Sequence, residues 1–224
     1  MSRLKYLNTS DEQGLSRHVG EMRKDLKDQN PRALSKYTAT EYRQTAPQQG
    51  GFYLKVWGQA VEFSYPDFVA RFEPSGELAP LPVQALLAYY FQTADGSPIS
   101  NRWVAFTELP EGRFYNQAFQ GYTGRELTRT FGSDIDQFAD LISMLPTAET
   151  NPDMVPIGDR AFPLQALPRV PVLVVFWQGD EDFPPSYQIL FDASIVHYLP
   201  TDVCAILGSM LTRKLIAAKH PPGE

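Results

Sequence analysis

The densest group of ionisable side chains in this chain lies in one turn between two apolar segments. Three successive carboxylates, Asp180, Glu181 and Asp182, occupy that turn. Carboxylates held together on a rigid turn can bind a hard cation, because hard cations prefer oxygen ligands. The turn can equally be a solvated hairpin end, where charge protects strand edges from unwanted pairing. Its spacing lacks the alternating oxygen ligands of an EF-hand loop, so the sequence favours the solvated turn.

Three further residues complete the candidate binding site. Trp177 precedes the turn and would form an aromatic wall, Asp192 ends the following strand, and His197 lies shortly beyond it. A histidine there could be an axial metal ligand or a proton carrier, because imidazole changes its charge near neutral pH. It could also be a structural residue bonded to a backbone carbonyl at a helix entry. A metal site would draw on Asp180, Asp182 and His197.

The segments around the turn have the composition of paired strands. Strands are predicted over residues 160–167, 170–177 and 187–191, because the first two are mostly apolar and the third alternates. A closing helix is predicted from a Thr201 cap, with apolar residues at helical spacing. Cys204 falls in its first turn, where we expect a small core residue rather than a reactive thiol.

The N-terminal region has a helical pattern. Leu15, Val19, Met22 and Leu26 recur at helical spacing, and Asn30 followed by a proline indicates the start of a second helix. We therefore predict a helical hairpin in an N-terminal extension over residues 1–47.

Segments with the residue pattern of β-strands begin after that extension. Alternating residues predict strands over residues 52–57 and 61–65, with a short third strand near residues 68–72. Glycine at the first position of a two-residue loop indicates a type II′ turn at Gly58 and Gln59.

Three more helical segments follow in the middle of the chain. One is amphipathic from Pro82, with Val83, Leu86 and Leu87 on its inner face. An aromatic-rich segment over residues 112–131 is predicted to be a helix broken near Gly121 or Gly124, and another helix follows Ser133.

These elements together predict an α+β fold in which an antiparallel sheet is packed by helices, with an N-terminal helical hairpin. We expect one domain over residues 1–224, because 224 residues with 43% hydrophobic content can bury one sizeable core. The best internal boundary is at residues 147–154.

Composition restricts the partners and the compartment. A net charge of −6 argues against nucleic acid and against docking on an anionic membrane. A protein or a small molecule remains as a possible binding partner. The single cysteine excludes an intrachain disulfide, and the first 15 residues contain no apolar segment of signal-peptide length, so we expect a cytoplasmic protein.

Motif absences leave the function open. The sequence contains no P-loop, no G-x-G-x-x-G, no H-E-x-x-H and no G-x-S-x-G. Three hypotheses stay in competition. The first is a binding or accessory protein for a metal-containing cofactor or a redox partner, the second is an enzyme that uses the acidic turn and His197 as acid and base, and the third is a scaffolding domain.

Three stretches of the sequence read GGFYLKVWGQAVEF (residues 50–63), LLAYYFQTADGSPISNRWVAFTELPEGRFYNQAF (residues 86–119) and ALPRVPVLVVFWQGDEDFPPSYQILFDASIVHYLPTD (residues 166–202). In this order they resemble the domain-of-unknown-function family DUF3786 of anaerobic bacteria and archaea. The family's W-x-G-D-E-x-F-P stretch matches Trp177, Gly179, Asp180, Glu181, Phe183 and Pro184.

The resemblance implies no particular activity. Some members of the family are fused to a four-cysteine iron–sulfur module, which implies anaerobic redox or corrinoid-linked metabolism. With Cys204 alone, this chain has no such module. The cofactors that the resemblance and the candidate residues suggest are a corrinoid, a haem or a single metal ion.

Overall fold

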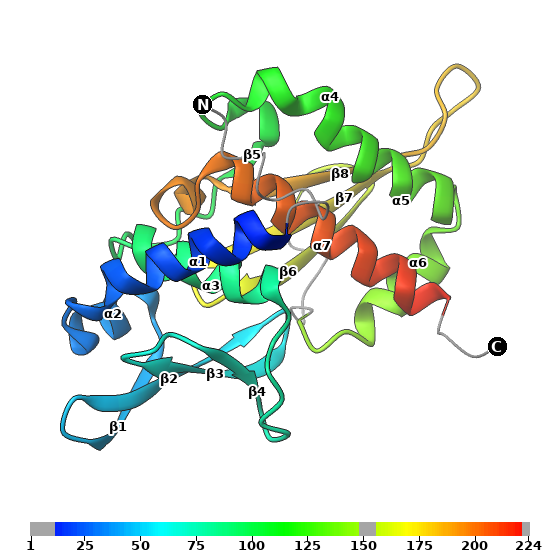
Figure 1. The fold of residues 1–224 in the computed structure, drawn as a ribbon. Coiled ribbons are helices and arrows are strands. Elements are labelled where there is room, and N and C mark those ends of the chain that lie inside the picture. The colour runs from blue at the N-terminus through cyan, green and yellow to red at the C-terminus, as the bar shows by residue number, and fades with distance from the viewer. Residues whose placement is uncertain (1–11, 148–155, 221–224) are drawn as a thin grey trace. The chain divides into compact units, whose positions relative to one another are not determined.

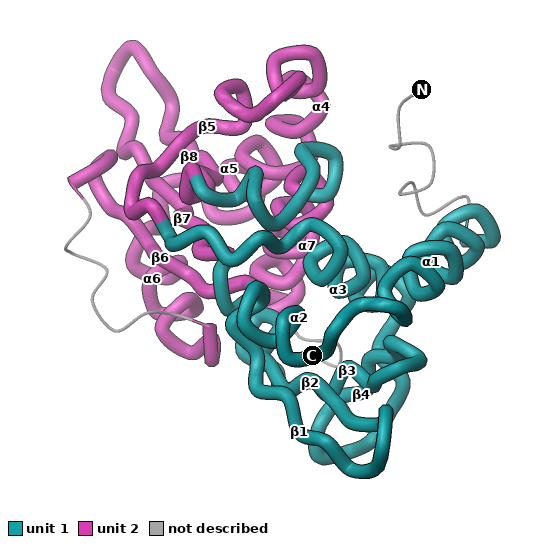
Figure 2. Tube along the Cα trace, turned by 90° about the vertical axis from the view of Figure 1, so that its left-hand side faces the viewer, with its two compact units in different colours: residues 1–99, 167–169, 194–203 teal, residues 100–166, 170–193, 204–224 magenta. Residues whose placement is uncertain are grey.

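A computed structural model describes residues 12–147 and 156–220 of the chain. The chain divides into two compact units, which Figure 2 colours separately. Unit 1 comprises Met1–Ile99, Leu167–Arg169 and Ser194–Val203, and unit 2 comprises Ser100–Ala166, Val170–Ala193 and Cys204–Glu224. Each unit contains one four-stranded sheet and helices of its own, which confirms the predicted α+β class with antiparallel sheets.

The described part of unit 1 begins with the predicted helical hairpin, formed by α1 (Glu12–Lys27) and α2 (Pro31–Thr38) (Figure 1). The predicted apolar stripe of α1 is buried, and the Asn30 side chain caps α2 by accepting from the backbone N–H groups of Arg32 and Ala33. The prediction that the helical extension continues to residue 47 was wrong. Ala39 adopts a left-handed conformation with φ of 50° and ends α2, so the following residues form a strand.

The sheet of unit 1 has the strand order β1-β2-β3-β4, and all neighbouring pairs are antiparallel. Its strands are β1 (Glu41–Ala46), β2 (Gln49–Val56), β3 (Gln59–Tyr65) and β4 (Ala70–Phe72). The short strand predicted near residues 68–72 is therefore confirmed as β4.

The hairpin between β2 and β3 differs from its predicted turn type. Val56 pairs with Gln59, so the two loop residues are Trp57 and Gly58, with φ of 49° and 79°. Positive φ at both central residues is the geometry of a type I′ turn, not type II′. The error arose because Trp57, a bulky residue that rarely adopts positive φ, was assigned to the strand.

Helix α3 (Leu81–Thr93) packs on the sheet of unit 1. The Phe91 ring lies 4.8 Å from that of Phe52 and 5.0 Å from that of Phe63. The amphipathic pattern predicted for this helix was wrong, because every residue from 83 to 91 is buried. Helix α1 covers another side of α3, where Arg23 donates to Gln84 Oε1 at 2.6 Å, and a helix enclosed on several sides buries its whole circumference.

Unit 2 contains the second sheet, with the strand order β5-β8-β7-β6. Its strands are β5 (Trp103–Ala105), β6 (Arg160–Leu167), β7 (Val170–Trp177) and β8 (Ser186–Asp192). The last three strands agree with the predicted segments. Unlike the other three, β5 was not predicted, because three residues are too few to display a period.

Helices cover this second sheet with aromatic side chains. They are α4 (Gly112–Tyr122), α5 (Gly124–Phe131), α6 (Ile135–Ser143) and most of α7 (Thr201–Lys219). The predicted break near Gly121 or Gly124 is confirmed at Thr123, where φ is −124° and ψ is −93°. The Phe119 ring of α4 stacks 4.2 Å from that of Phe106, and the Phe138 ring of α6 lies 4.9 Å from that of Tyr187.

Two expectations concern organisation at a larger scale. The predicted boundary at residues 147–154 lies outside the described residues except for Thr147, and the single domain stays a prediction. None of the described helices has the length and apolar content that crossing a bilayer requires.

Candidate functional site

The acidic turn lies in the loop between β7 and β8, which extends beyond the ends of both strands (Figure 1). Asp180 Oδ1 accepts from the backbone N–H groups of Asp182 and Phe183, both at 2.9 Å. The backbone N–H of Asp180 donates to the Phe183 carbonyl at 2.8 Å. The Asp180 carboxylate therefore stabilises the turn, while the Glu181 and Asp182 side chains are exposed.

Trp177 and Asp192 occupy opposite ends of the hairpin in unit 2. Trp177 pairs with Ser186 beside the loop and is 43% exposed. Asp192 ends β8 and is 1% exposed, and its Oδ1 accepts from the backbone N–H and the hydroxyl of Ser100 at 2.9 and 2.8 Å. At about 3.3 Å per residue, the length of β8 separates Asp192 from the turn by roughly 20 Å. The structure does not bring these two parts of the predicted site together.

His197 belongs to unit 1, at the end of the 3₁₀ helix η4 (Ala193–His197). Its Nδ1 lies 2.7 Å from Oδ2 of Asp95, two residues beyond the end of α3. The sequence suggested a backbone carbonyl as its structural partner, and the partner is a carboxylate instead. In the neutral imidazole, donation from Nδ1 to Asp95 leaves Nε2 with the lone pair. Asp95 was missed because it is remote from His197 in sequence.

Asp95 is oriented by a short turn of its own. The backbone N–H of Ser97 donates to Asp95 Oδ1 at 2.9 Å, and Gly96 between them adopts φ of 84°. Hydrogen bonds from the side chain and backbone of Ser97, followed by the one from His197, lower the pKa of the Asp95 carboxyl to about 2. Asp95 is therefore an ionised acceptor at neutral pH, and it faces Nδ1 in a fixed orientation.

Buried tyrosines support this turn from within unit 1. The Tyr198 hydroxyl donates to the Ser97 carbonyl, and the Tyr198 ring lies 5.7 Å from that of Tyr90. The Tyr90 hydroxyl donates to the Thr38 carbonyl at 2.7 Å and accepts from the backbone N–H of Arg169 at 3.2 Å. Burial raises the pKa of Tyr90 far above its usual value. Hydrogen bonds and packed tyrosine rings therefore support the turn that carries Asp95.

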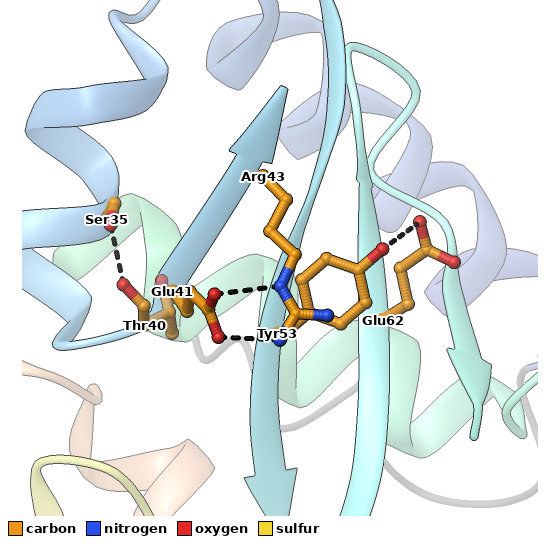
Figure 3. Close-up of polar contacts among 6 residues, drawn as sticks. All are labelled: Ser35, Thr40, Glu41, Arg43, Tyr53 and Glu62. Atoms are coloured by element: carbon orange, nitrogen blue, oxygen red, sulfur yellow. Dashed lines mark hydrogen bonds and ion pairs between the residues drawn. The ribbon is translucent and has the colours of Figure 1, made fainter. Parts of the chain in front are cut away.

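The sheet of unit 1 carries another polar cluster, on strands β1, β2 and β3 (Figure 3). The Glu41 carboxylate accepts two hydrogen bonds from Arg43, both at 2.8 Å, and the guanidinium carbon lies 4.2 Å from the Tyr53 ring centroid. The Tyr53 hydroxyl lies 3.4 Å from Glu62 Oε1. Each charged side chain in this cluster has a partner. These contacts hold the side chains in place on an exposed face of the sheet.

Two observations bear on metal and thiol chemistry. Within residues 12–147 and 156–220, no three His, Cys, Asp or Glu side chains are grouped so that they could hold a metal ion. Cys204 is 1% exposed in α7, which agrees with its predicted place in the core.

Comparison with known proteins yields one match. Neither the curated proteins nor the solved structures contain a matching sequence or fold. A family model described as Domain of unknown function (DUF3786) matches residues 30–214, which include the acidic turn, Asp95 and His197. The match covers most of the chain and agrees with the resemblance seen in the sequence. The chain belongs to the DUF3786 family.

Proposed function

We propose that this protein is a binding or accessory protein that contributes His197 as a ligand to a metal-containing cofactor of the corrinoid or haem type. The observation that carries the proposal is the 2.7 Å contact between His197 Nδ1 and Asp95 Oδ2. Histidines that ligate metals usually donate their other ring N–H to a carboxylate or carbonyl, which orients the ring and raises the basicity of the ligating nitrogen. Asp95 supplies that carboxylate.

The Asp95–His197 pair offers a single ligating atom. One ligating atom suits a corrinoid or haem, which needs only one ligand from the protein. Asp95 is occupied by Nδ1 and by Ser97, so Nε2 of His197 is the atom that can reach a ligand. A single imidazole nitrogen would suit a metal whose other ligands come from a macrocycle. The His197 side chain is 45% exposed, so a ligand can reach it from solvent.

The roles of the surrounding residues follow from their contacts. Asp95 would hold the imidazole ring and keep its proton on Nδ1. Ser97 would hold Asp95, because its backbone N–H donates to the second carboxylate oxygen. Bound to this pair, a corrinoid or haem would supply metal-centred chemistry, and the chain's own part would be to position one nitrogen.

The test is spectroscopic. Aquocobinamide and haemin both have an axial position that imidazole can occupy, and coordination shifts their visible absorption. We expect either probe to shift when purified protein is added, and the shift to disappear in His197→Ala. His18→Ala is the matched control, because His18 also lies near a carboxylate, with Nδ1 3.5 Å from Glu21 Oε2. That variant should behave as the unmodified protein does.

Asp95→Asn provides a second arm. It keeps the size of the side chain but removes the charge, so the affinity for the responding probe should fall by about 10- to 100-fold without abolishing the spectral shift. If neither probe responds to folded protein, or if His197→Ala responds unchanged, the proposal is wrong, and acid–base use of the Asp95–His197 pair becomes the hypothesis to test.

A further inference from the structure

A pocket of about 410 Å³ lies in unit 1 and is lined by Arg32, Ser35, Tyr42 and Gln44. This volume is within the range of about 300–1,000 Å³ typical of small-molecule sites. Helix α2 supplies the first two residues and strand β1 the other two. Thr40 lies between these two elements, and its N–H donates to the Ser35 carbonyl at 3.0 Å. The Ser35 hydroxyl donates to the Thr40 carbonyl at 2.6 Å, which is the contact drawn in Figure 3.

Arg32 supplies an uncompensated positive charge to this pocket. No side chain in residues 12–147 and 156–220 forms an ion pair or a hydrogen bond with its guanidinium. Arg43 on the neighbouring strand is the opposite case, because Glu41 neutralises it through two hydrogen bonds and the Tyr53 ring lies below it (Figure 3). An unpaired guanidinium presents a planar fork of N–H donors that fits a carboxylate.

Tyr42 adds a hydroxyl that is held in place. Its ring lies 5.0 Å from Phe52 and 6.1 Å from Tyr65, which fixes the ring from the core side. A Cβ at Gly50 would lie 2.7 Å from Tyr42 Oη, so the missing side chain of that glycine leaves space for the hydroxyl. Burial raises the pKa of the Tyr42 hydroxyl, with Arg32 opposing this effect, so the group stays a donor at neutral pH.

The other two lining residues offer acceptors. The Ser35 proton is already donated to the Thr40 carbonyl, so its oxygen can accept from a ligand. The Gln44 Nε2 donates to the Ala46 carbonyl at 3.2 Å, which leaves the amide oxygen of Gln44 as an acceptor. The pocket therefore combines a cation and a hydroxyl donor with two acceptors.

We infer that this pocket binds a small hydroxycarboxylate, with its carboxylate on Arg32 and Tyr42 and its hydroxyl donating to Ser35 or Gln44. A plain carboxylate would satisfy the donors and leave the acceptors unused. Inorganic phosphate also pairs with a guanidinium and carries a P–OH donor at neutral pH, so it is the competing ligand that the binding test includes. The site shares no residue with the Asp95–His197 pair, so the two proposals stand or fall separately.

The binding test uses three probes, glycolate, acetate and inorganic phosphate, added to the full-length protein and followed by NMR chemical shifts or calorimetry. We expect glycolate to bind more tightly than acetate and more tightly than phosphate. Because the pocket is partly open to solvent, we expect a dissociation constant in the range of roughly 0.1–10 mM. Phosphate binding more tightly than glycolate would overturn the assigned ligand class.

Variants assign the binding to this pocket. Arg32→Gln should weaken glycolate binding at least about 10-fold, because the positive charge and the fork of donors are lost, and Tyr42→Phe should weaken it about 3- to 10-fold, because one donor is lost. Arg43→Gln is the matched control, since it removes an arginine from the same region that already has a partner, and it should leave binding unchanged. His197→Ala should also bind glycolate normally. Equal affinity in Arg32→Gln and the unmodified protein, with intact thermal melts, would refute the inference.

Discussion

Asp95 and His197 are 102 positions apart in the sequence, yet Asp95 Oδ2 and His197 Nδ1 lie 2.7 Å apart. Both side chains are about half exposed, at 52% and 45%. Exposed ion pairs contribute little to folding, whereas a pair that orients a ligand matters mainly for binding. Effects on stability and on binding can therefore be separated at these two residues.

The first prediction uses that separation. Asp95→Asn and His197→Ala should each change the free energy of unfolding by less than about 1 kcal/mol, because solvent screens both groups. Urea denaturation at pH 7 measures this change, with the cofactor titrations run on the same preparations. Losses well above 1 kcal/mol would indicate that the pair is mainly a structural clamp.

A second prediction distinguishes two carboxylates of the sequence-predicted site. Asp192→Ala should destabilise unit 2 by about 2–4 kcal/mol, because a nearly inaccessible carboxylate that accepts two hydrogen bonds from Ser100 is lost. Glu181→Gln, on the exposed turn, should stay within about 0.5 kcal/mol of neutral. Guanidinium denaturation of both variants tests the contrast, and similar values for the two would contradict the assigned roles.

A third prediction concerns alkaline pH. Burial raises the folded-state pKa of Tyr90 above the unfolded value of about 10, so its contribution to stability is fully present below pH 10 and is lost as the pH rises beyond that value. Tyr90→Phe should cost about 1–3 kcal/mol at pH 8, because the Thr38 carbonyl loses its donor. The variant should also lose less stability than the unmodified protein between pH 9 and about 11, as measured by denaturation at each pH.

Two glycines should respond in opposite directions to alanine. Gly58 has φ of 79° in the type I′ turn, so Gly58→Ala should destabilise by about 1–2 kcal/mol. Gly20 lies inside α1, and a Cβ there would meet nothing within 4 Å. Gly20→Ala should therefore stabilise by about 0.5–1 kcal/mol. Thermal melts of the two variants provide the comparison, and a shift of the same sign in both would contradict these assignments.

The local sequence pattern was enough to predict the strands β6, β7 and β8 and the helix α7, because each is a long segment that is mostly apolar, alternates or has helical spacing. It was not enough where contacts between residues that are distant in the sequence determine burial or the type of element. Residues 83–91 of α3 are buried on every side, although the sequence pattern suggested one apolar face. The six residues of β1 were taken for helix, because the left-handed Ala39 that ends α2 has no signature in its residue type.

The candidate site was predicted only in part for the same reason. His197 was singled out, but its partner Asp95 lies at the end of another helix and shares no local pattern with it. The acidic turn was proposed as a binding site from its composition alone. In the structure its Asp180 carboxylate accepts hydrogen bonds from the turn's own backbone. The pocket around Arg32 could not be predicted from the sequence, because two of its lining residues lie on β1, whose residues were taken for helix.

The division of the chain into units has a consequence for its synthesis on the ribosome. Unit 1 takes a segment from Ser194–Val203, so it is complete only after residue 203 has been added, and unit 2 also needs the α7 residues that follow. Residues 12–99 of unit 1 therefore lack this segment while about a hundred more residues are added at roughly 5–20 residues per second. Nascent chains paused before residue 194 should accordingly be bound by chaperones, and those paused after the whole of α7 has emerged should be released.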